Sequence, residues 1–149
     1  MSDPIEILLV EDNPNDVELT LHALGKYRLS TRVVVVRDGA EALDFLFSEG
    51  QYAGRVPENP KVVLLDLKLP KVSGTEVLHR VKSDPRTKSI PVVVLTSSNE
   101  ERDILESYRL GANSYILKPV DFEQFTSSVK QLGLYWLLVN QSPRLEGRP

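Results

Sequence analysis

The run Val62–Pro70, VVLLDLKLP, most strongly constrains how this chain can fold. Its first four residues are apolar and are followed by a single acid, Asp66. A run this short and this apolar is typical of a strand buried on both faces, as the strands of parallel sheets are. Asp66 then lies where the strand ends, and ligands of open α/β sheets bind at the carboxyl ends of strands. We therefore predict a parallel sheet with a functional carboxylate at one edge.

The same alternation of a short apolar run and a helical pattern recurs along the 149 residues. The five predicted strands cover residues 5–10, 33–36, 62–65, 92–95 and 114–117. Apolar residues at helical spacing follow each strand, and three of these helices have the expected N-caps Asn13, Asn99 and Asp121. Five successive β-α units predict an α/β fold, a doubly wound parallel sheet with right-handed crossovers and helices on both faces.

The composition excludes several classes of protein. The net charge is −3 without any basic block, which gives nucleic-acid binding no electrostatic support. There is no cysteine, and no apolar run reaches the roughly 18 residues of a membrane span. The N-terminus lacks the basic region of a signal peptide, so a cytoplasmic location is expected. The length is typical of one domain, predicted over residues 1–140 and followed by a tail over 141–149.

One connection is longer than the fold requires. The polar stretch from Ser48 to Lys61 contains two glycines and two prolines, whereas connections in α/β proteins usually have about 2–6 residues. The stretch either has a specific role or is a tolerated insertion, and we favour an insertion.

Polar side chains follow four of the five predicted strands. These are Glu11 and Asp12 after the first strand, Asp66 after the third, Thr96 after the fourth and Lys118 after the fifth. Taken singly, each is as well explained by a helix cap or a solvated side chain. Because the carboxyl ends of parallel strands lie at one edge of the sheet, however, three carboxylates, a hydroxyl and an ammonium are expected to meet in one cleft.

The chemistry of this set points to phosphoryl transfer. Three neighbouring carboxylates repel one another, and a bound divalent cation removes that penalty. Oxygen ligands without histidine or cysteine select a hard cation, Mg²⁺ or Mn²⁺. Lys118 and Thr96 opposite such a cation are typical of a clamp for a phosphoryl group. Since phosphoryl transfer depends mainly on positioning and charge neutralisation, Asp66 is the predicted nucleophile that accepts the group.

Four segments carry a resemblance to a known family: LLVEDNPND, VVLLDLKLPKVSG, IPVVVLTSS and GANSYILKPVD. In this order and at this spacing they resemble the receiver domain of response regulators, over roughly residues 5–132. The resemblance implies a flavodoxin-like sheet of five strands in the order 2-1-3-4-5. It also implies a two-component signalling protein that accepts a phosphoryl group from a sensor histidine kinase. Such a protein is a phosphoacceptor rather than an ordinary enzyme, although it promotes its own phosphorylation and dephosphorylation.

The resemblance also implies a role for each acid at the sheet edge. Asp66 would be the phosphorylation site. Asp12 and Asp66 would bind Mg²⁺ directly, together with the backbone carbonyl of Lys68, and Glu11 would act through water.

Three further residues have roles that the resemblance implies. Thr96 and Lys118 would bind the phosphoryl group and shift when it arrives. Tyr115 would be the aromatic switch residue of the family, and the peptide bond from Lys118 to Pro119 would be cis, as is usual there.

Within the family, the chain is most similar to the stand-alone regulators that pair with bacterial phytochrome histidine kinases. The similar features are the long 48–61 loop, the segment KSDPRTKSIPVVVLTSS and the aromatic end LGLYWLLVNQSP. The expected partner is therefore a histidine kinase of the phytochrome type. Only a short tail follows the last predicted helix, so the output is expected to act through protein contacts.

The last predicted helix, which ends near residue 139, favours a homodimer. Its apolar stripe is Phe122, Phe125, Val129, Leu132 and Trp136. Beyond Gly133 the helix is apolar all round, with Tyr135, Leu137 and Leu138 off that stripe. An apolar surface of this kind has to be covered, and a second chain is expected to cover it through the face of helix four, strand five and helix five. The alternative is a tail that folds back on its own domain.

Other functions fit the residues less well. A flavodoxin-like electron carrier would need a small-residue phosphate loop after the first strand, where this chain has EDNPND. A phosphatase with an aspartate nucleophile would have a second acid two residues later, where Lys68 lies. A receiver-like module that binds partners without phosphorylation stays open as the alternative, and the complete set of reactive residues argues against it.

Overall fold

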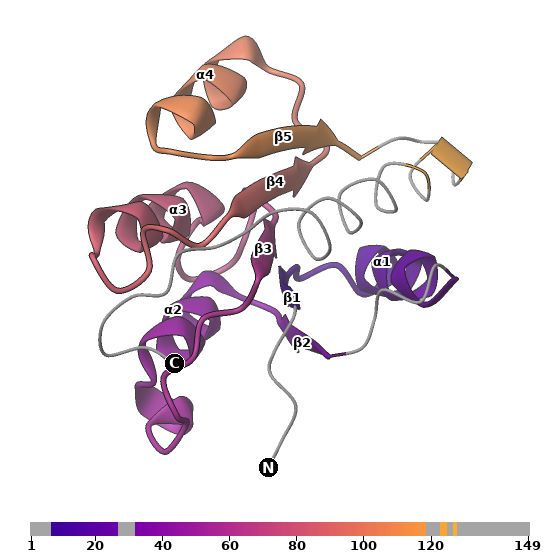
Figure 1. Ribbon diagram of the computed structural model, residues 1–149. Helices are drawn as coiled ribbons and strands as arrows, with labels where there is room; N and C mark the ends of the chain where they lie inside the picture. The colour runs from indigo at the N-terminus through magenta and orange to yellow at the C-terminus, as the bar shows by residue number, and fades with distance from the viewer. Residues whose placement is uncertain (1–6, 27–31, 119–122, 125–126, 128–149) are drawn as a thin grey trace.

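The computed structural model describes residues 7–26, 32–118, 123–124 and 127. Its centre is a five-stranded sheet in the order β2-β1-β3-β4-β5 (Figure 1). The strands are β1 (Ile7–Val10), β2 (Val33–Val36), β3 (Val62–Leu65), β4 (Val92–Thr96) and β5 (Ser114–Leu117). All four strand pairings are parallel. The predicted fold class and strand order are therefore confirmed.

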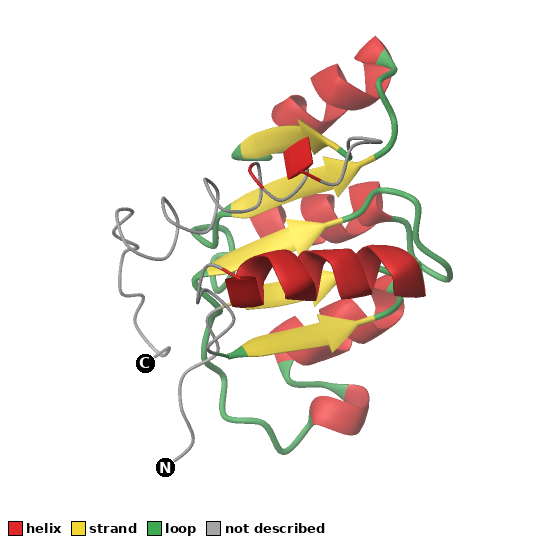
Figure 2. Ribbon diagram, turned by 90° about the vertical axis from the view of Figure 1, so that its right-hand side faces the viewer, coloured by secondary structure: helices red, strands yellow, loops and turns green. Residues whose placement is uncertain are grey.

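Helices cover both faces of the sheet. Helix α1 (Pro14–Lys26) lies on one face, and α2 (Gly39–Phe47) and α3 (Gly74–Ser83) lie on the other (Figure 2). Helix α4 (Glu101–Arg109) lies beside β5 at the edge of the sheet. Among the described residues, no helix has the length and apolar character needed to cross a membrane.

Most of the expected fifth helix, including its cap Asp121, falls outside the described residues, as does Pro119. The same holds for the tail over 141–149 and for the expected interface residues Tyr135, Leu137 and Leu138.

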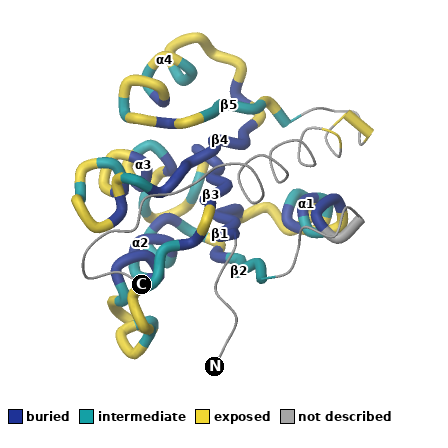
Figure 3. Tube along the Cα trace, viewed as in Figure 1, coloured by how far each residue is buried: buried dark blue, intermediate teal, exposed yellow. Residues whose placement is uncertain are grey.

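The sheet separates two apolar layers. On one side, Leu8 and Val10 of β1 pack in the layer that contains the buried residues of α2 and α3. On the other side, Ile7 and Leu9 pack in the layer that contains the buried residues of α1. Successive side chains of a strand point to opposite faces, so a central strand needs apolar residues along most of its length. Figure 3 shows the central strands β1, β3 and β4 buried along their length, as their unbroken apolar runs predict.

The predicted helix caps have different outcomes. Asn13 caps α1, because its Oδ1 accepts hydrogen bonds from the backbone N–H groups of Asn15 (2.8 Å) and Asp16 (3.2 Å). The prediction for Asn99 is wrong, since α4 begins at Glu101 and Asn99 is exposed. The N-cap position is held by Glu100, whose side chain makes no capping hydrogen bond. The buried Ser98 hydroxyl accepts from the backbone N–H of Glu100 at 3.4 Å, in the turn that precedes the helix.

The long connection between Ser48 and Lys61 packs against α2. It contains a short 3₁₀ helix, η1 (Gly50–Tyr52), and Tyr52 Oη donates to Glu41 Oε2 at 2.7 Å. Arg55 donates through Nε to the carbonyl oxygen of Phe45 at 3.0 Å, and its guanidinium lies 4.0 Å from the centre of the Phe45 ring. These contacts make the connection an extension of the α2 layer.

Candidate functional site

The register of the sheet brings Glu11 and Asp66 together. Val10 of β1 is paired with Leu65 of β3, so the next residue of each strand leaves the sheet at the same level. The backbone N–H of Asp66 donates to the carbonyl oxygen of Val10 at 3.0 Å, which extends the ladder by one step. The two acids are therefore placed by backbone pairing, before any side-chain contact is considered.

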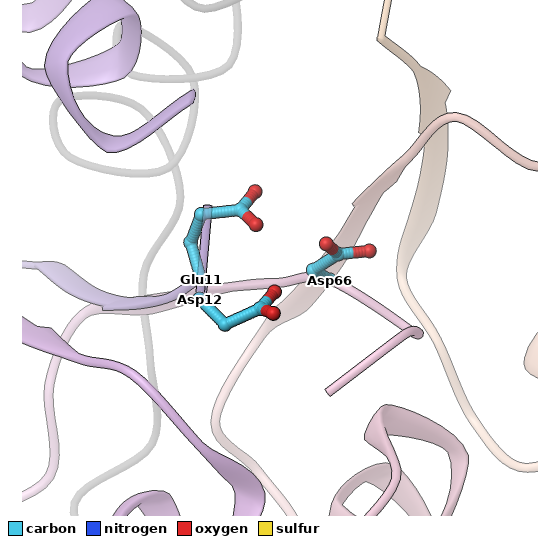
Figure 4. A group of neighbouring side chains, drawn as sticks. All are labelled: Glu11, Asp12 and Asp66. Carbon is cyan, nitrogen blue, oxygen red and sulfur yellow. The ribbon is translucent and has the colours of Figure 1, made fainter. Parts of the chain in front are cut away.

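Three carboxylates meet at this edge. Glu11, Asp12 and Asp66 each offer an oxygen, and these oxygens lie within 4.8 Å of one another (Figure 4). Glu11 and Asp66 are buried, with 2% and 7% of their surface exposed, whereas Asp12 is exposed. This donor set consists of carboxylate oxygens and opens to solvent on one side, which fits a hard divalent cation that keeps part of its water shell. The prediction that these acids converge is confirmed.

Lys118 joins the cluster from the end of β5. Its Nζ donates to Glu11 Oε1 at 2.5 Å, to Asp16 Oδ2 at 2.8 Å and to Asp66 Oδ2 at 3.2 Å. Its backbone N–H donates to the carbonyl oxygen of Thr96 at 2.8 Å, which continues the β4–β5 ladder past the last strand residue. An ammonium has three donors, and here each of them has a carboxylate acceptor.

Burial and pairing shift the pKa values in the cluster. Burial raises the pKa of Glu11 to about 7; the nearby Asp66 adds to the rise and Lys118 opposes it. Burial by itself would lower the pKa of Lys118, but the hydrogen bonds to Asp16 and Glu11 and the charge of Asp66 outweigh burial and raise it. Lys118 is therefore a permanent cation facing a buried acidic group, an arrangement suited to holding a further anion or cation at the edge.

Thr96 and Tyr115 meet through one residue of the loop after β4. Thr96 is completely buried, and its Oγ1 accepts from the backbone N–H of Ser98 at 3.4 Å. The carbonyl oxygen of the same Ser98 accepts from Tyr115 Oη at 2.8 Å. A change at the Thr96 hydroxyl can therefore reach the Tyr115 ring through the backbone of one residue, Ser98.

One participant, Asp16, was not predicted. It lies in the first turn of α1, four residues after Asp12, while the prediction considered only residues directly after a strand. An acid in a first helical turn ordinarily indicates a favourable interaction with the helix dipole. Lys68 is exposed, and its backbone N–H donates to Asp66 Oδ1 at 3.3 Å.

The geometry can be compared with known proteins. Residues 7–130 match the family model of the response regulator receiver domain. The chain belongs to this family. Its five strands, its acidic edge and the lysine after β5 thus form the receiver domain of a two-component response regulator.

Three relatives illustrate the similarity. The chain is 44% identical to the probable methanogenesis regulatory protein FilR2 of Methanothrix harundinacea, over 95% of this chain and 89% of FilR2. It is 44% identical to the phosphorylated cyanobacterial phytochrome response regulator RcpA, over 95% of this chain and 100% of that structure, with a TM-score of 0.87. It is 38% identical to the Mn²⁺-bound form of Rcp1, a response regulator of Synechocystis, over 95% of this chain and 100% of that structure, with a TM-score of 0.85.

These relatives place the chain close to the phytochrome response regulators within the receiver family. The predicted family and its relation to two-component signalling are therefore confirmed.

Proposed function

We propose that Asp66 accepts a phosphoryl group from a sensor histidine kinase and that the domain signals in the phosphorylated form. The observation that carries this proposal is the position of the Asp66 carboxylate. It lies at the end of the central strand, 3.2 Å from the ammonium of Lys118 and beside two further carboxylates. In the reaction, one Asp66 oxygen bonds to phosphorus while the bond from phosphorus to the donor nitrogen or oxygen breaks.

The residues around Asp66 divide the remaining tasks. Asp12, Asp66 and the backbone carbonyl of Lys68 would hold Mg²⁺ or Mn²⁺, with Glu11 acting through water; the Mn²⁺-bound form of Rcp1 supports a cation in this family. The cation would supply charge neutralisation for the phosphoryl oxygens. The Lys118 ammonium offers a charge-assisted donor to the same oxygens.

Thr96 and Tyr115 would transmit the phosphorylation of Asp66 to the surface of the domain. Thr96 supplies the side-chain hydroxyl of β4, at the carboxyl end of the strand, and this hydroxyl would turn toward the phosphoryl group. Its present contact with the Ser98 N–H would then change, and Ser98 also binds Tyr115. With the groups around Asp66, the domain would promote its own phosphorylation and dephosphorylation. The contacts of Ser98 with Thr96 and Tyr115 would transmit the result to the face of α4 and β5.

The kinase is proposed to be a bacterial phytochrome. The support is the similarity to RcpA and Rcp1 over the whole length of both structures. FilR2, whose name refers to methanogenesis, is as similar to this chain as RcpA is, at 44% identity. Phosphoryl transfer from a purified phytochrome kinase is therefore the measurement that tests the proposed partner. Faster transfer from that kinase than from an unrelated histidine kinase is expected.

Labelling by a small phosphodonor tests the phosphorylation site. Acetyl phosphate with Mg²⁺ is expected to add one phosphoryl group, seen by intact mass, and a chelator is expected to prevent it. Asp66→Asn should remain unlabelled because its amide is a poor nucleophile. Asp44→Asn, on α2 and away from the edge, is the matched control and should be labelled like the wild type.

Two results would redirect the assignment. Equal labelling of Asp66→Asn and the wild type would place the phosphoryl group elsewhere. No labelling of the wild type by acetyl phosphate or by any kinase would favour the alternative function, a receiver-like module that binds partners without phosphorylation.

A further inference from the structure

Lys118 has one carboxylate partner that stands apart from the other two. Glu11 and Asp66 belong to the three-carboxylate cluster at the sheet edge, whereas Asp16 does not. The distance from Lys118 Nζ to Asp16 Oδ2 is 2.8 Å, shorter than its distance of 3.2 Å to Asp66 Oδ2. The side-chain contact that links the Asp16 carboxylate to this cluster is its ion pair with Lys118.

The Asp16 carboxylate is held in place by its helix. Its backbone N–H donates to the Oδ1 of the cap Asn13 at 3.2 Å. The next residue, Val17, is 2% exposed and packs in the apolar layer under α1. The Asp16 side chain is 27% exposed and that of Lys118 is 11% exposed. The ion pair therefore ties the end of β5 to the first turn of α1, through a carboxylate whose backbone cannot move freely.

The other two partners have competing tasks in the proposed function. A cation at the edge would draw on Glu11 and Asp66. A phosphoryl group on Asp66 would take one of its carboxylate oxygens into a covalent bond. Either event weakens the contacts that Glu11 and Asp66 make with Lys118, and neither involves Asp16. A lysine side chain has four rotatable carbon bonds, so without a remaining partner its ammonium would lose its position at the moment when it is needed.

We infer that Asp16 is a positioning residue that keeps the Lys118 ammonium beside Asp66 when a cation and a phosphoryl group engage the other carboxylates. The role of Asp16 in phosphorylation rests on the proposed function. The anchoring of Lys118 by Asp16 rests on the ion pair alone. Groups that orient a reacting or ligating side chain commonly change activity by about 10–100-fold when they are removed.

The anchoring is tested without phosphorylation, by NMR of the Lys118 ammonium in the presence of saturating Mg²⁺. The Nζ resonance is assigned by its absence in Lys118→Gln. In the wild type it should persist when Mg²⁺ is added. In Asp16→Asn it should be lost or displaced on Mg²⁺ addition, because a neutral amide oxygen holds an ammonium much less strongly than a carboxylate does. Glu18→Gln, which removes the same charge from an exposed position of α1, should leave the resonance unchanged.

The role in the reaction is tested by the rate of labelling with acetyl phosphate. Asp16→Asn should label about 10-fold more slowly than the wild type. Asp16→Glu, which keeps the carboxylate, should recover part of that loss, and Glu18→Gln should label at the wild-type rate. In a Lys118→Ala background, Asp16→Asn should have no further effect, because two residues that act through one contact are not additive.

Each outcome supports or overturns the inference. An unchanged Lys118 resonance in Asp16→Asn with Mg²⁺ would overturn the anchoring, whatever the labelling rate. A displaced resonance with a wild-type labelling rate would overturn the role in the reaction. If the wild type is never labelled, the proposed function is wrong, and so is the role of Asp16 in the reaction. The NMR result would still decide whether Asp16 anchors Lys118.

Discussion

At the scale of single residues, Gly74 links the start of α3 to the end of β3. A Cβ atom at this position would lie 2.1 Å from the carbonyl oxygen of Asp66 and 2.5 Å from the Cα of Leu67. The Gly74 N–H also donates to the carbonyl oxygen of Leu67 at 2.9 Å. The close approach allows the helix to begin directly against the segment that carries Asp66. The contacts are to backbone atoms, so no side-chain rotation can relieve a clash.

Gly74→Ala is therefore expected to destabilise the domain. Alanine in place of glycine would favour a helix by at most about 1 kcal/mol, while overpacking against backbone costs about 1–3 kcal/mol. We expect the overpacking to win and to lower the free energy of unfolding by about 1–2 kcal/mol, measured by urea denaturation. Gly54→Ala is the control, since nothing lies within 4 Å of its added Cβ. Equal unfolding midpoints for the two variants would contradict the close approach as a constraint.

At the scale of elements, Lys82 joins the end of α3 to the starts of two strands. Its Nζ donates to the carbonyl oxygens of Lys88 (3.2 Å) and Ile90 (2.7 Å) and to Asn113 Oδ1 (3.1 Å). Asn113 Oδ1 also accepts from the backbone N–H of Val92, the first residue of β4, at 2.8 Å. These three acceptors are neutral oxygens. Burial lowers the pKa of Lys82 from 10.5 to about 8.

This shift predicts a pH dependence of stability. The unfolded chain keeps the Lys82 proton until about pH 10.5, whereas the folded chain releases it near pH 8. Because the unfolded state binds more protons in that window, Lys82 makes the free energy of unfolding rise with pH there. Lys82→Met should remove this contribution, so that its stability relative to the wild type falls as the pH rises from 8 to 10.5. Lys88→Met, at an exposed position, should follow the wild-type curve; parallel curves for all three proteins would refute the prediction.

At the scale of the whole molecule, we propose a homodimer through the face of α4, β5 and the last predicted helix. Three described residues of this face are large, apolar and exposed: Leu105 at 62%, Tyr108 at 50% and Leu117 at 44%. Burying one such side chain contributes roughly 1.5–3 kcal/mol, and a two-fold axis buries both copies at once. Tyr115 lies on β5 of this face, which would let phosphorylation bias the pairing.

Sedimentation tests the dimer. The wild type is expected to dimerise at tens of micromolar, while Leu105→Glu/Tyr108→Glu should be monomeric because charge is placed in a buried apolar contact. Tyr135→Glu/Leu138→Glu tests the part of the face that lies outside the described residues. Val56→Glu, at an apolar position that is 66% exposed on the loop after α2, should dimerise like the wild type. A wild type that stays monomeric, phosphorylated or not, would favour the tail that folds back on its own domain.

Features that depend on neighbours along the chain could be predicted from the sequence. The bounds of β2, β3 and β5 agree with the predicted ranges. For β3 the reason is burial on both faces, which requires an unbroken apolar run. For the edge strands β2 and β5, which are only partly buried, short runs rich in β-branched and aromatic residues were enough. The convergence of Glu11, Asp66 and Lys118 also followed, because parallel strands all end at one edge. The Asn99 cap was wrong because α4 begins one residue later than expected, with Glu100 at the N-cap position and no side-chain cap. The Ser98 hydroxyl instead donates to Asp103 Oδ2, a contact between the loop and the helix that the favourable cap residue Asn99 did not reveal.

The sequence by itself therefore determined which elements form and which reactive residues reach the edge, since alternation and burial act over a few residues at a time. Only the tertiary structure decided how the ammonium of Lys118 is shared. Asp16 is 102 residues away from Lys118 along the chain. From its neighbours in the sequence, Asp16 is explained by a favourable interaction with the N-terminus of its helix. Their contact depends on how α1 lies across the sheet relative to the end of β5, and helix position is set by side-chain packing over the whole layer rather than by any local pattern.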